Sequence, residues 1–402
     1  MTRSYPSLYR LFLSILLLLC AFGCTAPYAF DEKAFENVLI VDGTLSNQMK
    51  KHKIFLSRSY AFDGEPESEK NAIVYVKSDQ GERFDFVVQK GGYYESELAF
   101  SAQANVSYTL FIESQEGQTY RSTPMTLPET SNITNVYAAA TENDRDEPGI
   151  GIYLDASSES NAARLYRFEY EETYKIIAPY WTPYDAVVVF EGYSTFATDV
   201  ILRETEEQTC YGTDYSNRIL LRSTLNQTED RLEKELIRFI PITDSKLQYR
   251  YSILVRLLVE SPQAYSYFET LKDLSVTSSA FFTEKQPGYI AGNISNLEDP
   301  FEKVGGFFRV AAVAEKRIFF SLEDFYPEAP QPDYFISCIQ LAPTAEGTRG
   351  NRNLLNTIYS AYGRFYQYNT GEMPGGPYIF VNAPCGDCTV LGSNRKPDFW
   401  NP

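Results

Sequence analysis

Four cysteines in the second half of the chain are the first candidates for covalent or metal-binding chemistry. They are Cys210, Cys338, Cys385 and Cys388, and the last two stand in the motif CGDC. Such a set could ligate zinc, exchange disulfides through the Cys-x-x-Cys pair, or form two structural bridges, for which three connectivities exist. We predict bridges from the CGDC cysteines to Cys210 and Cys338, because closing long loops removes more entropy from the unfolded chain.

Carboxylates are the other candidates for chemistry. The single histidine, His52 in MKKHK, would have to serve any Ser-His-Asp or Cys-His site, and we expect an exposed polar turn there instead. Glu172 lies on the apolar face of FEYEETY, where burial would raise the pKa of a catalytic acid, but pairing with an arginine is the commoner outcome for such a group. The segment from Asp144 to Asp155 resembles a calcium loop, yet Pro148 takes its fifth position. We expect a solvated interdomain linker there.

The chain begins with the features of an export signal. A basic head is followed by an apolar run over residues 11–23, which is shorter than the roughly 20 residues that span a bilayer. We predict a signal peptide over residues 1–23 and a tether over residues 24–36. The sequence AFGC resembles the bacterial lipoprotein box, so we predict that Cys24 carries lipid and anchors the protein in the outer membrane. Exported cysteines meet an oxidising space, which favours bridges over thiolates.

Composition excludes some classes of partner. The chain has 402 residues, which is enough for two domains, and its net charge is −17 at pH 7. No arm rich in lysine and arginine interrupts this acidity, so a nucleic-acid partner is not expected. The charge is typical of a soluble exported surface, and no motif for a cofactor or a metal stands out.

Alternating apolar and polar residues predict β-strands over most of the chain. Within residues 37–130, segments such as RFDFVV and SYTLFIE alternate with the glycine turns SDQGE and QKGGY. This spacing predicts an immunoglobulin-like β-sandwich. A change of composition between residues 123 and 149 marks the domain boundary, and we assign residues 131–402 to a larger β-rich domain with one or two short helices.

One helix is predicted in the second domain. In SPQAYSYFETLKDLS, Ser261 is a candidate N-cap and Pro262 suits the first helical position, so we predict a helix near residues 262–273. The segment TEDRLEKELIRFI fits either a second helix or a strand.

Aromatic residues in probable loops are candidates for contact with a ligand or a partner. The segment APYWTPY contains Tyr180, Trp181 and Tyr184 among prolines. Loops carry binding residues more often than strands do, so we name these three as contact candidates.

Several segments occur in an order that resembles a known family. They are VLIVDGTL after the lipid-type cysteine, FEYEETY, QPGYIAGNISN, VGGFF and the terminal CGDCTVLGSNRKPDFW. The series, over residues 37–400, resembles the lipoprotein family called domain of unknown function 4249. Its members are envelope lipoproteins of Gram-negative bacteria, commonly encoded beside TonB-dependent outer-membrane receptors. The resemblance implies a β-barrel receptor partner and no catalytic residues. It carries over Cys24 as the anchor and Cys385 and Cys388 as structural residues.

We therefore expect a non-enzymatic outer-membrane lipoprotein that assists a TonB-dependent receptor in substrate capture or import. One alternative is a structural subunit of an envelope assembly or secretion complex, and another is a carboxylate-based hydrolase built on Glu172. Acidic residues at Asp31 and Glu32 stand too far from Cys24 to settle whether the protein faces the periplasm or the cell surface. No motif identifies the ligand.

Overall fold

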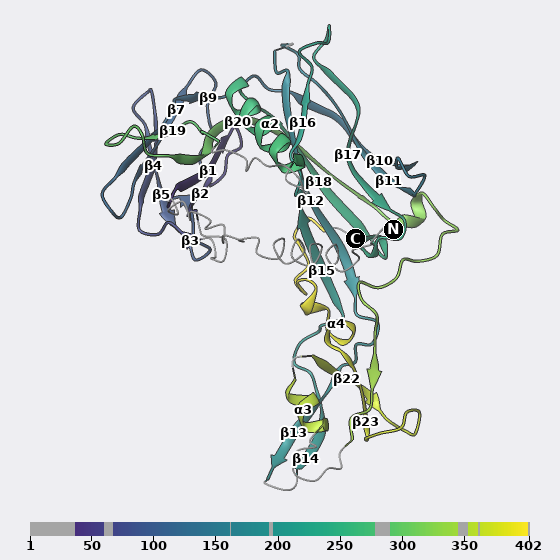
Figure 1. The fold of residues 1–402 in the computed structure, drawn as a ribbon. Helices are drawn as coiled ribbons and strands as arrows, with labels where there is room; N and C mark the ends of the chain where they lie inside the picture. The colour runs from purple at the N-terminus through teal and green to yellow at the C-terminus, as the bar shows by residue number, and fades with distance from the viewer. Residues whose placement is uncertain are drawn as a thin grey trace, which may run out of the picture.

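The fold is described here from a computed structural model, which is mainly β (Figure 1). It describes residues 37–59, 67–160, 162–192, 196–277, 290–344, 353–360 and 362–400. The predicted signal peptide, Cys24 and the tether lie outside the described residues. The prediction of a mainly β fold with an N-terminal sandwich, a larger β-rich part and few short helices is confirmed.

The N-terminal strands form one sheet that curls around a single core, which we call the first sandwich. Its strands are β1 (Leu39–Ser46), β2 (Lys53–Arg58), β3 (Glu67–Ser68), β4 (Ile73–Ser78), β5 (Arg83–Val88), β6 (Tyr93–Ser96), β7 (Ser107–Glu113), β8 (Thr119–Ser122) and β9 (Met125–Thr126). Their main order is β1-β2-β6-β5-β4-β7-β8. Alternate residues of β7, such as Leu110 and Ile112, are fully buried, as the period of two predicts.

The chain returns to this sandwich about 170 residues after leaving it. Strand β19 (Ile294–Asn296) pairs with β8, and the long strand β20 (Val304–Phe320) pairs in parallel with β1 through residues 304–311. Gly306 permits this pairing, because a Cβ atom there would lie 1.9 Å from the carbonyl oxygen of Val41. The core of the first sandwich therefore includes Phe307 and Phe308, which lie far beyond the predicted boundary at residue 130.

The second half of β20 belongs to a second sandwich. Residues 312–320 pair antiparallel with β18 (Tyr251–Val259). The same sheet contains β12 (Leu165–Ile177), β15 (Thr209–Tyr215) and β16 (Leu220–Ser223). It faces a sheet of β10 (Asn132–Glu142), β11 (Pro148–Ser157) and β17 (Arg231–Pro241), and the two share a core (Figure 1). The segment TEDRLEKELIRFI thus supplies a strand, since Leu232, Ile237 and Ile240 of β17 are buried in that core.

Helix α2 (Pro262–Thr277) is present where a helix was predicted. The hydroxyl oxygen of Ser261 accepts a hydrogen bond from the backbone N–H of Ala264 at 3.2 Å, so Ser261 is the N-cap. Ala264 is buried in the core of the first sandwich, and the ring of Tyr267 packs on Phe307 at 5.0 Å between centroids. The helix therefore belongs to the junction of the two sandwiches although it follows a strand of the second.

A third unit projects away from both sandwiches, and we call it the arm (Figure 1). It consists of β13 (Tyr184–Glu191), β14 (Phe196–Leu202), β21 (Gln340–Leu341), α3 (Asn353–Tyr359), β22 (Gly363–Tyr368) and β23 (Tyr378–Asn382). Its small core contains Ala186, Leu354, Phe365, Tyr378 and Phe380. The remaining short helices are α4 (Ala383–Gly386), η1 (Ser245–Leu247), η2 (Leu322–Asp324) and η3 (Cys388–Val390).

Candidate functional site

One disulfide joins the base of the arm to the second sandwich, and another closes the base of the arm itself. Cys388 in η3 bonds to Cys210 in β15, and Cys385 in α4 bonds to Cys338, which precedes β21. The prediction that CGDC is bonded to Cys210 and Cys338 is confirmed. The two CGDC cysteines are not bonded to each other and none of these four sulfurs is left as a thiolate, so the zinc and thiol-exchange alternatives for them are wrong.

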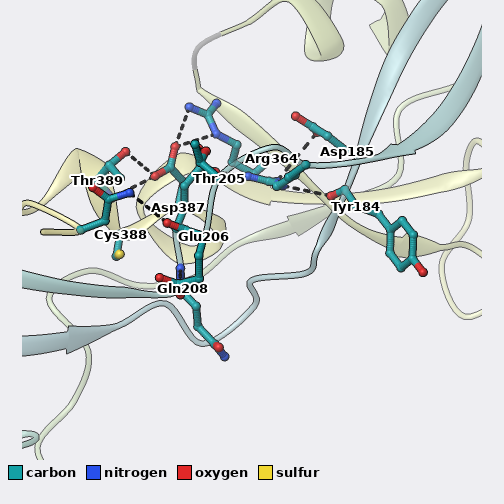
Figure 2. A network of polar contacts seen from close by, with 12 residues as sticks. Tyr184, Asp185, Thr205, Glu206, Gln208, Arg364, Asp387, Cys388 and Thr389 are labelled. Atoms are coloured by element: carbon teal, nitrogen blue, oxygen red, sulfur yellow. Dashed lines mark hydrogen bonds and ion pairs between the residues drawn. The ribbon is translucent and has the colours of Figure 1, made fainter.

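Asp387, inside the CGDC motif, organises the polar contacts around these bridges (Figure 2). One of its carboxylate oxygens accepts hydrogen bonds from Nε and Nη2 of Arg364 at 3.0 and 2.9 Å. The other accepts the backbone N–H of Thr389 at 2.9 Å, which makes Asp387 the N-cap of η3. Asp387 is buried, so this charge-assisted pair connects β22 of the arm to η3. The sequence analysis missed this role, although an Asp two residues before a Thr is a local capping signal.

Arg203, directly after β14, fixes the other chain segment at the base of the arm. Its Nε donates to the carbonyl oxygen of Tyr184 at 3.0 Å, and its Nη1 donates to the carboxylate of Glu207. The backbone N–H of Cys388 donates to the carbonyl oxygen of Glu207 at 2.9 Å. The base of the arm is therefore held by covalent, ionic and backbone contacts together, and we call this region the hub.

The three aromatic contact candidates do not share one surface. Tyr180 is half-buried in the hub, where its N–H donates to the carbonyl of Cys385 at 2.9 Å and its ring meets Tyr366 edge-on. Trp181 packs against the core of the second sandwich, and its buried indole N–H has no hydrogen-bond partner among the described residues. Tyr184 opens β13 and is 45% exposed. Of the three, Tyr184 has the exposure that a contact residue needs.

The arm exposes large apolar side chains on several elements. On the hairpin, Phe190 is 57% exposed and Leu202 is 65% exposed. Between α3 and β22, Tyr362 is 85% exposed. Others on the arm are Val189, Ile201, Leu341, Tyr359 and Tyr368. Several exposed apolar side chains on one small unit favour a role of the arm in protein contact.

Comparison with known proteins identifies the family. The model of the domain of unknown function DUF4249 matches residues 25–317, which is more than half of the chain. The chain belongs to the DUF4249 family. No curated protein matches it. A solved structure described as "Biofilm associated protein - B domain" is 8% identical, with 70% of this chain and 86% of that chain covered, but its TM-score of 0.12 supports no argument about fold or function.

In this DUF4249 protein Glu172 is engaged by two cations, as the favoured alternative predicted. Its side chain is 2% exposed, with Oε1 at 2.6 Å from Nε of Arg238 and Oε2 at 2.6 Å from Nζ of Lys246. Burial opposes the charge of Lys246, but its hydrogen bonds to Asp214 and Glu172 outweigh burial and raise its pKa.

The predicted exposed turn at His52 is wrong, because the DUF4249 fold buries this side chain. His52 is 1% exposed, and its Nε2 lies 2.9 Å from the carbonyl oxygen of Phe100. A carbonyl only accepts, so Nε2 carries the proton of the neutral ring, while the buried Nδ1 has no partner among the described residues. Burial lowers the pKa of His52 to about 4, against the smaller opposing effect of the bond to Phe100.

The pKa of His52 predicts an acid-sensitive fold. The unfolded chain takes up a proton near pH 6.5, whereas the folded chain does so near pH 4. The folded state is thus penalised as the pH falls from 6.5 to 4, by roughly 3 kcal/mol in total, and the loss is constant below pH 4. The single imidazole should titrate by NMR with a midpoint near pH 4, well below that of a free histidine. His52→Gln should reduce the pH dependence of unfolding in this window, and an NMR midpoint near 6.5 in the wild-type protein would contradict the assignment.

The segment from Asp144 to Asp155 is a hairpin rather than an interdomain linker. Residues 143–147 form the turn between β10 and β11, where Asn143 accepts hydrogen bonds from the backbone N–H groups of Arg145 and Glu147. The rest of the segment is β11. No group of three or more potential metal ligands occurs among the described residues.

The helices of the described residues are α2, α3, α4, η1, η2 and η3. None of them, in the part of the chain that the structure describes, is both long enough and apolar enough to cross a bilayer.

Proposed function

We propose that this DUF4249 protein is a non-enzymatic lipoprotein of the outer membrane that works with a TonB-dependent receptor in the capture or import of a substrate. Membership of the family supports a receptor partner, and the lipoprotein box at Cys24 supports the membrane anchor. The observation that carries the proposal is the arm, a small disulfide-anchored unit that exposes apolar and aromatic side chains.

The hub makes the arm suitable for docking. An isolated two-stranded hairpin such as β13–β14 is marginally stable in water, so its exposed residues would not keep a fixed arrangement alone. The hairpin packs on the core formed by α3, β22 and β23, and the hub fixes its base. A preorganised surface loses less entropy on binding, and aromatic side chains supply much of the affinity in protein interfaces. We assign Phe190 and Leu202 to the receptor contact.

Affinity purification tests this function. A tagged chain from gently solubilised envelopes should bring a β-barrel receptor with it, and Cys24→Ala should release the chain from the membrane fraction. Combining Phe190→Asp and Leu202→Asp should reduce the recovered receptor by about fivefold or more, since each charge would be desolvated in the interface.

Phe301→Asp is the matched control, because Phe301 is 93% exposed and lies outside the arm. It should leave the recovered receptor unchanged. Absence of any receptor under conditions that preserve known complexes would sink the proposal. Broad loss of envelope proteins in a deletion strain would favour the structural-subunit alternative.

A further inference from the structure

A pocket of about 680 Å³ lies at the edge of the second sandwich, between its two sheets. Its walls include Tyr170 and Glu172 of β12, Asp214 and Tyr215 of β15, and Arg238 of β17. The connection between β15 and β16 and the short helix η1 complete it. The volume is within the range of small-molecule sites in proteins.

The pocket is positive although the chain is strongly acidic. Three cationic side chains line it, Arg218, Arg238 and Lys246, against the two carboxylates of Glu172 and Asp214. The pocket thus carries a formal charge of +1, whereas the chain carries −17. Both carboxylates are occupied, because Glu172 is held by Arg238 and Lys246, and Asp214 lies 2.7 Å from Lys246. The excess positive charge is therefore available to a ligand.

Donor groups for that ligand remain free at the mouth. Arg218 is exposed and forms no hydrogen bond or ion pair with any residue that the structure describes. Arg238 uses only its Nε for Glu172, so both of its terminal amino groups remain without a partner among the described residues. The planar fork of an arginine fits a carboxylate through two parallel hydrogen bonds. A dianion such as phosphate fits less well, since it would face Glu172 and Asp214 with only one excess positive charge.

The other side chains that line the pocket could bind a hydroxylated ring. Tyr215 is 67% exposed and Tyr170 is buried in the wall, so both an accessible and a covered aromatic side chain border the space. The exposed amide of Asn217, next to Arg218, is free of hydrogen bonds to the described residues and could bond to hydroxyl groups. Aromatic faces with amide and arginine donors recognise the apolar face and the polar edge of a sugar ring.

We propose that this pocket binds a carboxylate-bearing sugar of the uronic acid class, with its carboxylate on Arg218 and Arg238 and its ring against Tyr215. The inference rests on the pocket itself and not on the receptor docking proposed above, because a purified chain should bind the sugar in the absence of any partner.

Calorimetry on the detergent-solubilised full chain tests the proposal, with D-glucuronate and D-galacturonate as probes and D-glucose and D-galactose as neutral controls. The uronates should bind at least about tenfold more tightly than the neutral sugars, and added salt should weaken them. Arg218→Gln should lower uronate affinity about tenfold, whereas Arg121→Gln should not, because Arg121 is an exposed residue of β8 that does not line the pocket.

A further variant tests the contact to the sugar ring separately from the contact to its carboxylate. Tyr215→Ala should weaken uronate binding while leaving the weak binding of acetate unchanged. Equal affinity for neutral sugars, binding of inorganic phosphate as tight as that of uronate, or uronate binding unaffected by Arg218→Gln would each overturn the proposal, and so would the absence of uronate binding at millimolar concentration. Because Arg218 and Tyr215 are exposed, these substitutions should leave the thermal midpoint unchanged, which circular dichroism verifies.

Discussion

Replacing both Cys210 and Cys388 by serine is expected to lower the free energy of unfolding by about 2–5 kcal/mol. This bridge closes a chain separation of 178 residues and ties β15 to the hub. Without it the unfolded chain gains the entropy of a long loop, while the folded chain keeps noncovalent contacts at that point, such as those of Asp387 and Glu207 and the backbone pair of Tyr211 with Ser393. Guanidinium unfolding of the oxidised wild-type and variant proteins measures the difference.

The second bridge provides the internal comparison. Cys338 and Cys385 are separated by 47 residues, so their replacement should cost about 1 kcal/mol less in the chain-entropy model. Reduction of the wild-type protein should reproduce the combined loss and make the arm the first region that a protease cleaves. An unchanged unfolding midpoint after loss of the Cys210–Cys388 bridge would show that the noncovalent contacts of the hub are sufficient.

Glu260→Gln is expected to destabilise the protein by about 2–3 kcal/mol, because Arg167 and Arg309 would keep only the more exposed carboxylates of Glu169 and Asp42 as counter-charges. Glu260 is fully buried at the end of β18, with Oε1 at 2.8 Å from Nε of Arg167 and 3.8 Å from Nε of Arg309. The ring of Phe268 on α2 contacts both guanidinium groups, with its centroid 4.4 Å from Cζ of Arg167 and 4.7 Å from Cζ of Arg309. These contacts connect β12, β18, β20 and α2, so the loss should weaken the junction of the two sandwiches.

The pKa of Arg167 indicates how strongly the junction depends on its carboxylates. Burial alone would lower this pKa, but Glu260 and Glu169 outweigh burial and raise it. Glu315→Gln is the matched control, since its 3.2 Å pair with Arg256 is more exposed and should contribute less than about 1 kcal/mol. Chemical unfolding should therefore separate the two variants, and equal stability of both would contradict a buried role for Glu260.

The sequence analysis was accurate where a single local pattern decides the structure. The alternation in SYTLFIE predicted the buried face of β7, and Ser261 and Pro262 predicted the start of α2. The prediction of an exposed turn at His52 was wrong, because the polar residues around it, two of them lysines, favour a position on the surface. In the structure the ring of His52 is buried and packs edge-on against Phe100. The hairpin turn at residues 143–147 was also wrongly predicted as a linker, because turns and linkers share the same composition.

The amino-acid sequence was sufficient to predict the mainly β class and the family, and it limited the four cysteines to three connectivities, of which CGDC bonded to Cys210 and Cys338 was correctly preferred. Alternation with a period of two indicates that a strand has one buried face, and the number of cysteines limits the possible disulfide pairings. Neither reports which distant segment covers that face. Three features became visible in the tertiary structure alone. Strand β20 completes both sandwiches by pairing with β1 and β18, and the hub supports a projecting arm. Arg218 and Arg238 border one pocket. The physical reason is that these arrangements depend on contacts between residues far apart in the chain, such as Asp42 and Arg309, which no local period encodes.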